Sequence, residues 1–524
     1  MDYIKFQPVA NDRGGGKLYN GGMENKEKRP DLILVLDQGT TSSRALLIDR
    51  SGAVVASSRQ MFEQIYPKPG WVEHDPMEIL SSQLSALTGV LAYTDMGPER
   101  IAGIGITNQR ETTILWDRDT GRPLANAIVW QCRRTAGALE QLCKDPAVPQ
   151  MITERTGLVP DAYFSASKIA WLLDNIPGAR GQAERGRLAF GTVDSWLIYS
   201  LTGGRVHATD FTNASRTMLF NIHEGRWDEE LLRLFGIPAS LMPEVCPSAC
   251  DFGDVVHPSL PKGLRICGVA GDQQAALFGQ RCFSLGEAKC TLGTGAFLLM
   301  HTGGQACASR NRLVTTIAAS PPGKDGLEYA LEGSIFVAGA LIEWLKEGLG
   351  VLGAVEESEE LASRVPDTAG VFVVPAFTGL GAPWWDPDAR GTVTGLTRGA
   401  RKEHIVRAAL ESLAYQSADL ISSFCSDAGV ELRSLKADGG ASANGFLMQF
   451  MADILGMPVV RPDNPESTGL GAAFLAGLSC GFWDSLDEIM GLDLAAREFV
   501  PGQIDRQALM DGWREAVGMT RAHS

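Results

Sequence analysis

Two turns rich in glycine and hydroxyl residues have the composition of phosphate-binding sites. The first, Asp37–Thr41 (DQGTT), follows the apolar run 32–36, and the second, Gly293–Gly295, follows the run 289–292. Small residues allow backbone N–H groups and hydroxyls to approach an anion closely. Asp37 adds a carboxylate that can hold Mg²⁺ through water. Either turn alone is also typical of an ordinary hairpin, but the two turns together indicate a binding site for a nucleoside triphosphate, built from two parts of the chain.

A third glycine-rich stretch, Asp438–Asn444 (DGGASAN), precedes a helix that we expect from about residue 443 to 455, where Gly456 ends it. Its glycines would let a ligand lie against the backbone, so it is a candidate bed for adenosine. Alone it is weak evidence, because paired glycines before a helix are common in loops. The small residues of Gly469–Gly477 indicate close helix packing instead.

Charged residues near two other strands suit the recognition and activation of hydroxyl groups. Arg110 and Glu111 follow the apolar run 101–106, and together they offer hydrogen-bond donors and acceptors for neighbouring hydroxyls. An adjacent Arg-Glu pair is more often a solvated surface pair. Asp272 follows the run 264–270 and opens a helix, where it would serve either as a helix cap or as a base that accepts a hydroxyl proton.

The elements that carry these residues alternate between strands and helices. We expect strands at 32–36, 45–48, 101–106, 264–270, 289–292, 296–300, 371–374 and 435–437, and helices around 171–173, around 196–198 and over 404–423. This alternation predicts an α/β fold. Since 524 residues exceed what one core usually serves, we predict two domains, 31–280 and 281–524, after a disordered extension at 1–30.

The composition excludes several classes of protein. Lys and Arg number 47 against 62 Asp and Glu, a net charge of −15, which argues against nucleic acid or an anionic membrane as a partner. No apolar stretch approaches the ~20 residues of a membrane span. Ten cysteines without metal-ligand spacing predict reduced thiols and a cytoplasmic protein. Residues 1–30 have no apolar core of a secretory signal.

Two hairpin turns and one glycine-rich turn in two α/β domains resemble the actin-like ATPase superfamily, whose domains are ribonuclease-H-like. Tyr163–Leu172 resembles the sugar-kinase branch of that superfamily, the FGGY family, which includes glycerol, xylulose and gluconate kinases. Several stretches are similar to the glycerol kinases in particular, and the resemblance runs from about residue 31 to about 520. These stretches are Thr107–Thr113, Trp130–Thr135, Asn213–Thr217, Gly271–Ala276 and Pro375–Pro383.

The resemblance implies an ATP- and Mg²⁺-dependent kinase that converts glycerol to sn-glycerol 3-phosphate in a cleft between two domains that close on binding, and a homo-oligomer. Asp272 would be the general base, and Asp37 would hold the metal. The implied substrate residues are Arg110, Glu111, Tyr163, Asp272 and Gln273, with Trp130 and Phe297 as an apolar wall. The implied nucleotide residues are Thr40, Thr41, Ser42, Arg44, Thr294, Gly339, Glu343, Gly440 and Asn444. Glu343 departs from the family, which often has Gln there.

Two other functions stay open at this stage. A kinase of a pentulose or a longer polyol would share the phosphate turns and differ only in the pocket, and Arg110 with Glu111 argues against it. An actin-like or chaperone-like ATPase would share the turns but would have no need of a polyol pocket.

Overall fold

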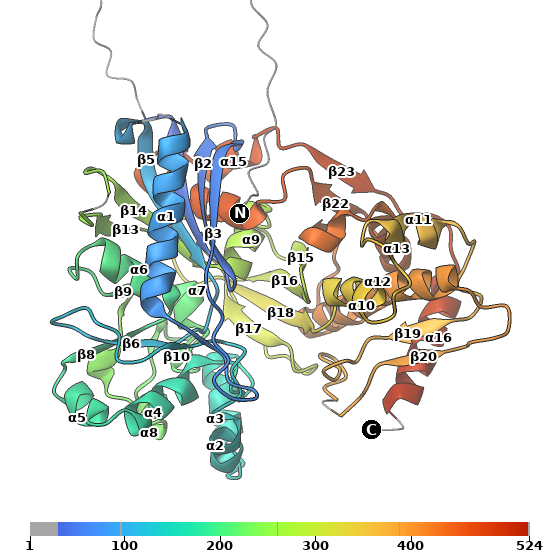
Figure 1. Ribbon diagram of the computed structural model, residues 1–524, viewed down its shortest axis with the longest axis horizontal. Coiled ribbons are helices and arrows are strands. Elements are labelled where there is room, and N and C mark those ends of the chain that lie inside the picture. Colours follow the sequence, from blue (N-terminus) through green and yellow to red (C-terminus); the bar gives the residue numbers. More distant parts are fainter. Residues whose placement is uncertain (1–29, 95–96, 259, 387, 522–524) are drawn as a thin grey trace, which may run out of the picture.

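The computed structural model describes residues 30–94, 97–258, 260–386 and 388–521. It contains two large β-sheets with helices packed on them, one in the N-terminal half and one in the C-terminal half (Figure 1). The expected extension at 1–30 lies outside the described residues apart from Pro30. Among the described helices, none is long and apolar enough to cross a membrane.

The N-terminal sheet has six strands in the order β13-β14-β5-β1-β2-β3. β1 pairs antiparallel with β2, and β1, β5 and β14 are parallel to one another. Parallel strands end at the same edge of a sheet, so the residues that follow β1, β5 and β14 become neighbours. Their bounds are β1 Leu32–Gln38, β2 Ser42–Asp49, β3 Val54–Met61, β5 Ile101–Asn108, β13 Ala249–Asp254 and β14 Arg265–Gly271.

The C-terminal sheet repeats this plan with seven strands in the order β17-β18-β16-β15-β21-β22-β23. β15 pairs antiparallel with β16, and β15, β21 and β22 are parallel. The repeated succession confirms the predicted α/β fold of two similar domains. The bounds are β15 Ala288–Leu292, β16 Ala296–Gly303, β17 Val314–Ile317, β18 Tyr329–Ile335, β21 Leu435–Asp438, β22 Val459–Pro462 and β23 Ala496–Phe499.

β1 is buried on both faces, as its unbroken apolar run requires. Leu32, Leu34 and Leu36 share one core with α1 (Pro76–Thr94) and α6 (Val193–Leu201). Ile33 and Val35 share the other core with α14 (Ser467–Cys480), which comes from the end of the chain. The second face of the N-terminal sheet is therefore covered by a helix from the C-terminal half.

Close packing holds α14 against α9 (Asp272–Gly279). A Cβ added to Gly471 would lie 1.8 Å from the carbonyl oxygen of Ala275, so only glycine fits at this crossing. This contact confirms the packing role expected from the small residues of 469–477.

Helices of the C-terminal half include α10 (Gly339–Glu347), α11 (Glu357–Ser363), α12 (Lys402–Ala428), α13 (Gly445–Leu455), α15 (Leu486–Met490) and α16 (Arg506–Arg521). α13 starts two residues later than expected, because 440–443 form a 3₁₀ turn and the Asn444 side chain then caps the helix by accepting from Leu447 N–H at 2.9 Å. It ends as expected at Gly456, which has φ +67°.

Several short helices and strands lie outside the large sheet in the N-terminal half (Figure 1). The helices are α2 Ala136–Leu142, α3 Ala147–Thr156, α4 Ser165–Asn175, α5 Ala179–Glu184, α7 Phe211–Ala214 and α8 Glu229–Leu234. The short strands are β4 Glu73–His74, β6 Ile114–Asp117, β7 Ala127–Ile128, β8 Leu188–Gly191, β9 Ala208–Asp210, β10 Phe220–Asn221, β11 Arg226–Trp227 and β12 Glu244–Cys246. α4 and α6 confirm the helices expected around 171–173 and 196–198, and β19 (Phe372–Val374), which pairs with β20 (Thr392–Thr394), confirms the strand at 371–374.

Candidate active site

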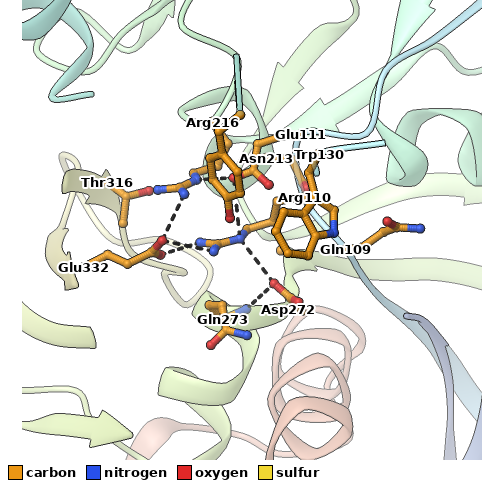
Figure 2. Close-up of polar contacts among 12 residues, drawn as sticks. Gln109, Arg110, Glu111, Trp130, Asn213, Arg216, Asp272, Gln273, Thr316 and Glu332 are labelled. Carbon is orange, nitrogen blue, oxygen red and sulfur yellow. Dashed lines mark hydrogen bonds and ion pairs between the residues drawn. The ribbon is translucent and has the colours of Figure 1, made fainter. Parts of the chain in front are cut away.

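Arg110 lies at the centre of a buried cluster of charges just beyond β5 (Figure 2). Its Nη1 and Nη2 donate to the two carboxylate oxygens of Glu332, in β18, at 2.6 and 3.1 Å. Its Nε lies 3.2 Å from Oδ1 of Asp272, at the start of α9. Only 3% of Arg110 is exposed. Arg110 is therefore not part of a solvated surface pair, and it joins residues from both sheets.

Glu111 and Arg216 complete this cluster. Nε of Arg216 donates to Oε1 of Glu111 at 2.6 Å, and Nη2 of Arg216 donates to Oε1 of Glu332 at 2.9 Å. Glu111 has φ +61°, a strained backbone conformation for a side chain other than glycine. The four residues form a buried, electrically balanced set of two arginines and two glutamates.

Burial and opposite charge compete in setting the pKa of each carboxylate in the cluster. Burial alone would raise the pKa of Glu332, but the guanidinium groups of Arg110 and Arg216 hold it at about 2. For Glu111, burial outweighs the attraction of Arg216 and Arg110, and the pKa is raised. Glu332 thus carries a negative charge at neutral pH.

Asp272 is the most accessible carboxylate of the group, with 35% of its side chain exposed. It is the first residue of α9, and its Oδ1 accepts from the backbone N–H of Gln273 at 2.7 Å. Burial raises the pKa of Asp272, against the opposing charges of Arg110 and Lys289. A carboxylate with a raised pKa is a better proton acceptor, which suits a general base.

Aromatic rings lie beside the charges. Trp130 and Tyr163 pack edge to face with their centroids 5.4 Å apart, and the Arg216 guanidinium lies 5.7 Å from the centre of the Tyr163 ring. Phe297 is linked to the charged residues through its backbone and not through its ring. Its carbonyl accepts from Nζ of Lys289 at 3.4 Å, and Lys289 also donates to the side chain of Gln273. All seven expected substrate residues are thus linked to one network.

The first phosphate turn touches the loop that carries Arg110. The side chain of Gln109 donates to the Gly39 carbonyl at 3.2 Å, its backbone N–H donates to the Gln38 carbonyl at 2.8 Å, and Nε1 of Trp130 donates to Oγ1 of Thr40 at 3.2 Å. Thr41 is exposed. Ser42, by contrast, is buried, and its hydroxyl accepts from Nε of Arg59 at 3.0 Å. Thr40 and Thr41 face the site more openly than Ser42 does.

Arg44 and Asp37 pair with each other, whereas we expected Asp37 to hold the metal and Arg44 to bind the nucleotide. Arg44 also binds both carboxylate oxygens of Glu466 at 2.8 and 2.9 Å. Burial raises the pKa of Glu466, the positive charge of Arg44 opposes this, and the negative charges of Asp37 and Asp438 raise the pKa further. Asp438 has a buried Oδ1 with no protein partner among the described residues.

The second phosphate turn and the third glycine-rich stretch border a cavity of about 870 Å³. The carbonyls of Gly293 and Thr294 accept the backbone N–H groups of Gly339 and Ala338, both at 2.9 Å, which fixes the turn against the start of α10. The volume lies within the range of pockets that hold small ligands. Five expected nucleotide residues line it, namely Thr294, Gly339, Glu343, Gly440 and Asn444.

Sequence reasoning missed Arg216, Glu332, Lys289 and Glu466. Arg216 belongs to a stretch already noted for its family similarity, and Glu332 is a charged residue within an otherwise largely apolar strand (YALEGSI). No group of three or more His, Cys, Asp or Glu residues in the described ranges is arranged to hold a metal ion by itself.

Two family models cover most of the chain, and they define its class. The N-terminal domain of the FGGY family of carbohydrate kinases matches residues 32–279, and the C-terminal domain of that family matches residues 288–480. The chain belongs to the FGGY family of carbohydrate kinases.

Within this family, the chain is similar to proteins named glycerol kinase. The chain is 56% identical over 493 residues to a glycerol kinase of Carboxydothermus hydrogenoformans, a match that covers 93% of this chain and 98% of the relative. It is 56% identical over 487 residues to a glycerol kinase of Caldanaerobacter subterraneus, covering 93% and 97%. A crystal structure of Plasmodium falciparum glycerol kinase with ADP superposes with a TM-score of 0.87 at 39% identity, covering 93% and 98%.

Proposed function

We propose that this protein transfers the γ-phosphoryl group of ATP to glycerol, giving sn-glycerol 3-phosphate. The observation that supports it best is that the first phosphate turn directly contacts the residues proposed to bind the acceptor hydroxyl. Gln109 hydrogen-bonds the turn at Gly39, and the next residue, Arg110, lies 3.2 Å from Asp272. A hydroxyl bound at Arg110 would therefore lie close to a phosphoryl group bound at the turn. The relatives above carry the name glycerol kinase.

In this proposal each residue near the triol has a distinct task. Arg110 and Glu111 hydrogen-bond neighbouring hydroxyls, while Trp130 and Phe297 contact the carbon atoms and Tyr163 closes the pocket. Asp272 accepts the proton of the attacking hydroxyl as the new P–O bond forms, with Gln273 beside it. Both contacts of Asp272 described above use Oδ1, so Oδ2 is available to the substrate.

We place the adenosine in the 870 Å³ cavity and the phosphates between the two turns. Backbone N–H groups and hydroxyls at Thr40, Thr41 and Thr294 would stabilise charge on the transferring group. Mg²⁺ fits beside Asp37, because Asp438 and Glu466 add negative charge there and an orphaned carboxylate oxygen belongs to Asp438. When bound, the ion would neutralise charge on the β- and γ-phosphates.

We further propose that residues 31–280 and 281–524 act as two domains that close on the substrates, that the enzyme works in the cytoplasm and that it forms a homo-oligomer. Closure would exclude water, which competes with glycerol for the phosphoryl group. Small-angle scattering with and without glycerol and a non-hydrolysable nucleotide tests closure, since an unchanged radius of gyration would contradict it.

A substrate panel tests the activity. ADP formation is measured with glycerol, with a pentulose, with a longer polyol and with no acceptor, for the wild type and for Asp272→Asn. We expect rapid ADP formation only with glycerol and only in the wild type. Equal rates without any acceptor would identify an ATPase that uses no polyol, and a preference for the pentulose would assign the pocket to another sugar kinase.

A further inference from the structure

Two cysteines far apart in the sequence meet where α14 packs on the N-terminal sheet. Cys267 lies in β14, and Cys480 is the last residue of α14. Both sulfur atoms lie next to Gly103 of β5. A Cβ added to Gly103 would lie 3.0 Å from Sγ of Cys267 and 3.3 Å from Sγ of Cys480. The missing side chain of Gly103 leaves the space in which the two sulfurs approach each other.

Each thiol donates to a backbone carbonyl, Cys267 to Arg265 at 3.6 Å and Cys480 to Gly477 at 3.8 Å, and the two sulfurs lie close enough to influence each other's pKa. Their exposure differs: Cys267 is 2% exposed, whereas Cys480 is partly exposed. An oxidant in solution can therefore reach Cys480, whereas Cys267 is buried in the core beside it. This is the arrangement of an attacking thiol with a resolving partner.

The surroundings of Cys480 favour its thiolate. The neighbouring Cys267 side chain lowers the pKa of Cys480, against burial, and the backbone N–H of Phe482 contributes in the same direction. The thiolate is the form of cysteine that peroxides oxidise. Burial raises the pKa of most of the other thiols, including Cys282 and Cys290 in the cores.

We propose that Cys480 and Cys267 are a peroxide-sensitive pair that forms a reversible disulfide between α14 and β14. The Cys480 thiolate attacks one oxygen of hydrogen peroxide and breaks the O–O bond, which yields a sulfenic acid at Cys480 and a hydroxide; the hydroxide takes up the proton that the Cys480 thiol had released and becomes one water. Cys267 then attacks that sulfur, releasing a second water, so two thiols are oxidised by two electrons and one peroxide is reduced. A thiol reductant reverses the reaction by exchange.

The bond would tie together two segments that lead to the active site. β14 runs directly into α9 and Asp272, and α14 begins next to Glu466, which binds Arg44 in β2, the strand that follows the first phosphate turn. Cys267 is in the N-terminal half and Cys480 in the C-terminal half, so the disulfide would also close a long covalent loop through both.

The chain provides its own control pair in Cys246 and Cys250. These two thiols also influence each other's pKa and are both partly exposed, but they are separated by only a short turn between β12 and β13. Burial raises the pKa of Cys246 to about 12, so its thiolate is scarce at neutral pH. A disulfide there would close a small local loop.

The test treats the full-length protein with increasing hydrogen peroxide, blocks remaining thiols with N-ethylmaleimide, and compares non-reducing gels and peptide masses. We expect a faster-migrating band, because a long internal loop compacts the denatured chain, and a cross-linked peptide pair containing Cys267 and Cys480. Dithiothreitol should remove both. Cys480→Ser and Cys267→Ser should abolish the band, and the double variant Cys246→Ser with Cys250→Ser should keep it.

Two results would overturn the proposal even if a variant folds poorly, because both are read on the wild type. One is the absence of the Cys267–Cys480 peptide at every peroxide concentration that leaves the circular dichroism spectrum unchanged. The other is oxidation of Cys480 to a sulfinic acid while Cys267 still reacts with N-ethylmaleimide.

Discussion

Replacing Glu332 by glutamine tests whether the buried charge cluster holds Arg110 in place. The substitution keeps the size of the side chain and removes one negative charge from a set whose exposed fractions do not exceed 3%. It leaves Arg110 and Arg216, which both bind Glu332, with only Glu111 and Asp272 as anionic partners.

The loss of folding stability expected from this substitution can be worked out from the pKa of Glu332. A fall from 4.5 to about 2 corresponds to about 3 kcal/mol of favourable interaction with the charged form. Removing one partner of a buried ion pair generally costs about 3–5 kcal/mol, which agrees. We therefore expect Glu332→Gln to destabilise the protein by about 3 kcal/mol at pH 7. The depressed pKa means that this stabilisation is complete above pH 4.5 and is lost as the pH falls toward 2, so the difference between variant and wild type should shrink in that window.

Urea unfolding followed by tryptophan fluorescence measures the stability, and initial rates at varied glycerol concentration measure the effect on binding. Because Arg110 would lose its bidentate partner, we expect KM for glycerol to rise about tenfold or more, as for other losses of geometry at a binding site. Glu328→Gln is the matched control: that residue precedes the same strand and pairs with Lys324 nearer the surface, so its loss should cost about 1 kcal/mol or less. A Glu332→Gln protein with wild-type KM and a stability within about 1 kcal/mol of wild type would refute the reasoning.

Four further predictions concern individual residues. Asp272→Asn should lower kcat by about 10²–10⁴-fold, the usual contribution of a general base, while calorimetry still detects ATP binding; a near-normal kcat would remove Asp272 as the base. In the wild type, kcat/KM should rise with pH through an inflection above 3.8, because the base must be deprotonated and burial raises the pKa of Asp272; an inflection at or below 3.8 would contradict this. Gly471→Ala should lower the thermal midpoint by several degrees, because its Cβ would lie 1.8 Å from the Ala275 carbonyl oxygen, whereas Gly518→Ala, which meets nothing within 4 Å, should not. Glu343→Gln should change KM for ATP and leave KM for glycerol unchanged, since Glu343 lines the cavity in which we place the adenosine; an effect on KM for glycerol would contradict this placement.

The sequence was sufficient to predict the parts of the site that depend on strand ends. Apolar runs of about five residues stop at Asp37, before Arg110 and before Asp272, and parallel pairing of β1, β5 and β14 then makes these positions neighbours. The end of the helix that follows Asn444 could be predicted for a similar reason, because its terminal Gly456 is a local signal. Local chemistry and the repeat of one topology thus account for most of the fold.

The partners of Arg110 could not be predicted in this way. Glu332 is 222 positions away in the sequence, and it reaches Arg110 only because β18 pairs with β16 and the sheet extends to the N-terminal half. Adjacent Arg110 and Glu111 suggested a pair that would bind substrate together, whereas the nearest charged partner of Glu111 is Arg216 at 2.6 Å and its distance to Arg110 is 3.9 Å. Each of the two residues is held by a partner that a local pattern does not reveal.

Glu332 belongs to a different half of the chain from the other residues of the charge cluster, and this affects the geometry of the whole site. Arg110, Glu111, Arg216 and Asp272 all come from the N-terminal half, where Glu111 pairs with Arg216 at 2.6 Å and Asp272 lies 3.2 Å from Arg110, but none of these contacts links the two arginines through a carboxylate held by both in a bidentate contact. The carboxylate that bridges both arginines comes from the C-terminal half, at 2.6 Å from Arg110 and 2.9 Å from Arg216. The orientation of Arg110 therefore depends on how β18 is docked against the N-terminal half. Any change that moves β18 should alter the proposed polyol pocket even when it leaves every predicted substrate residue in place.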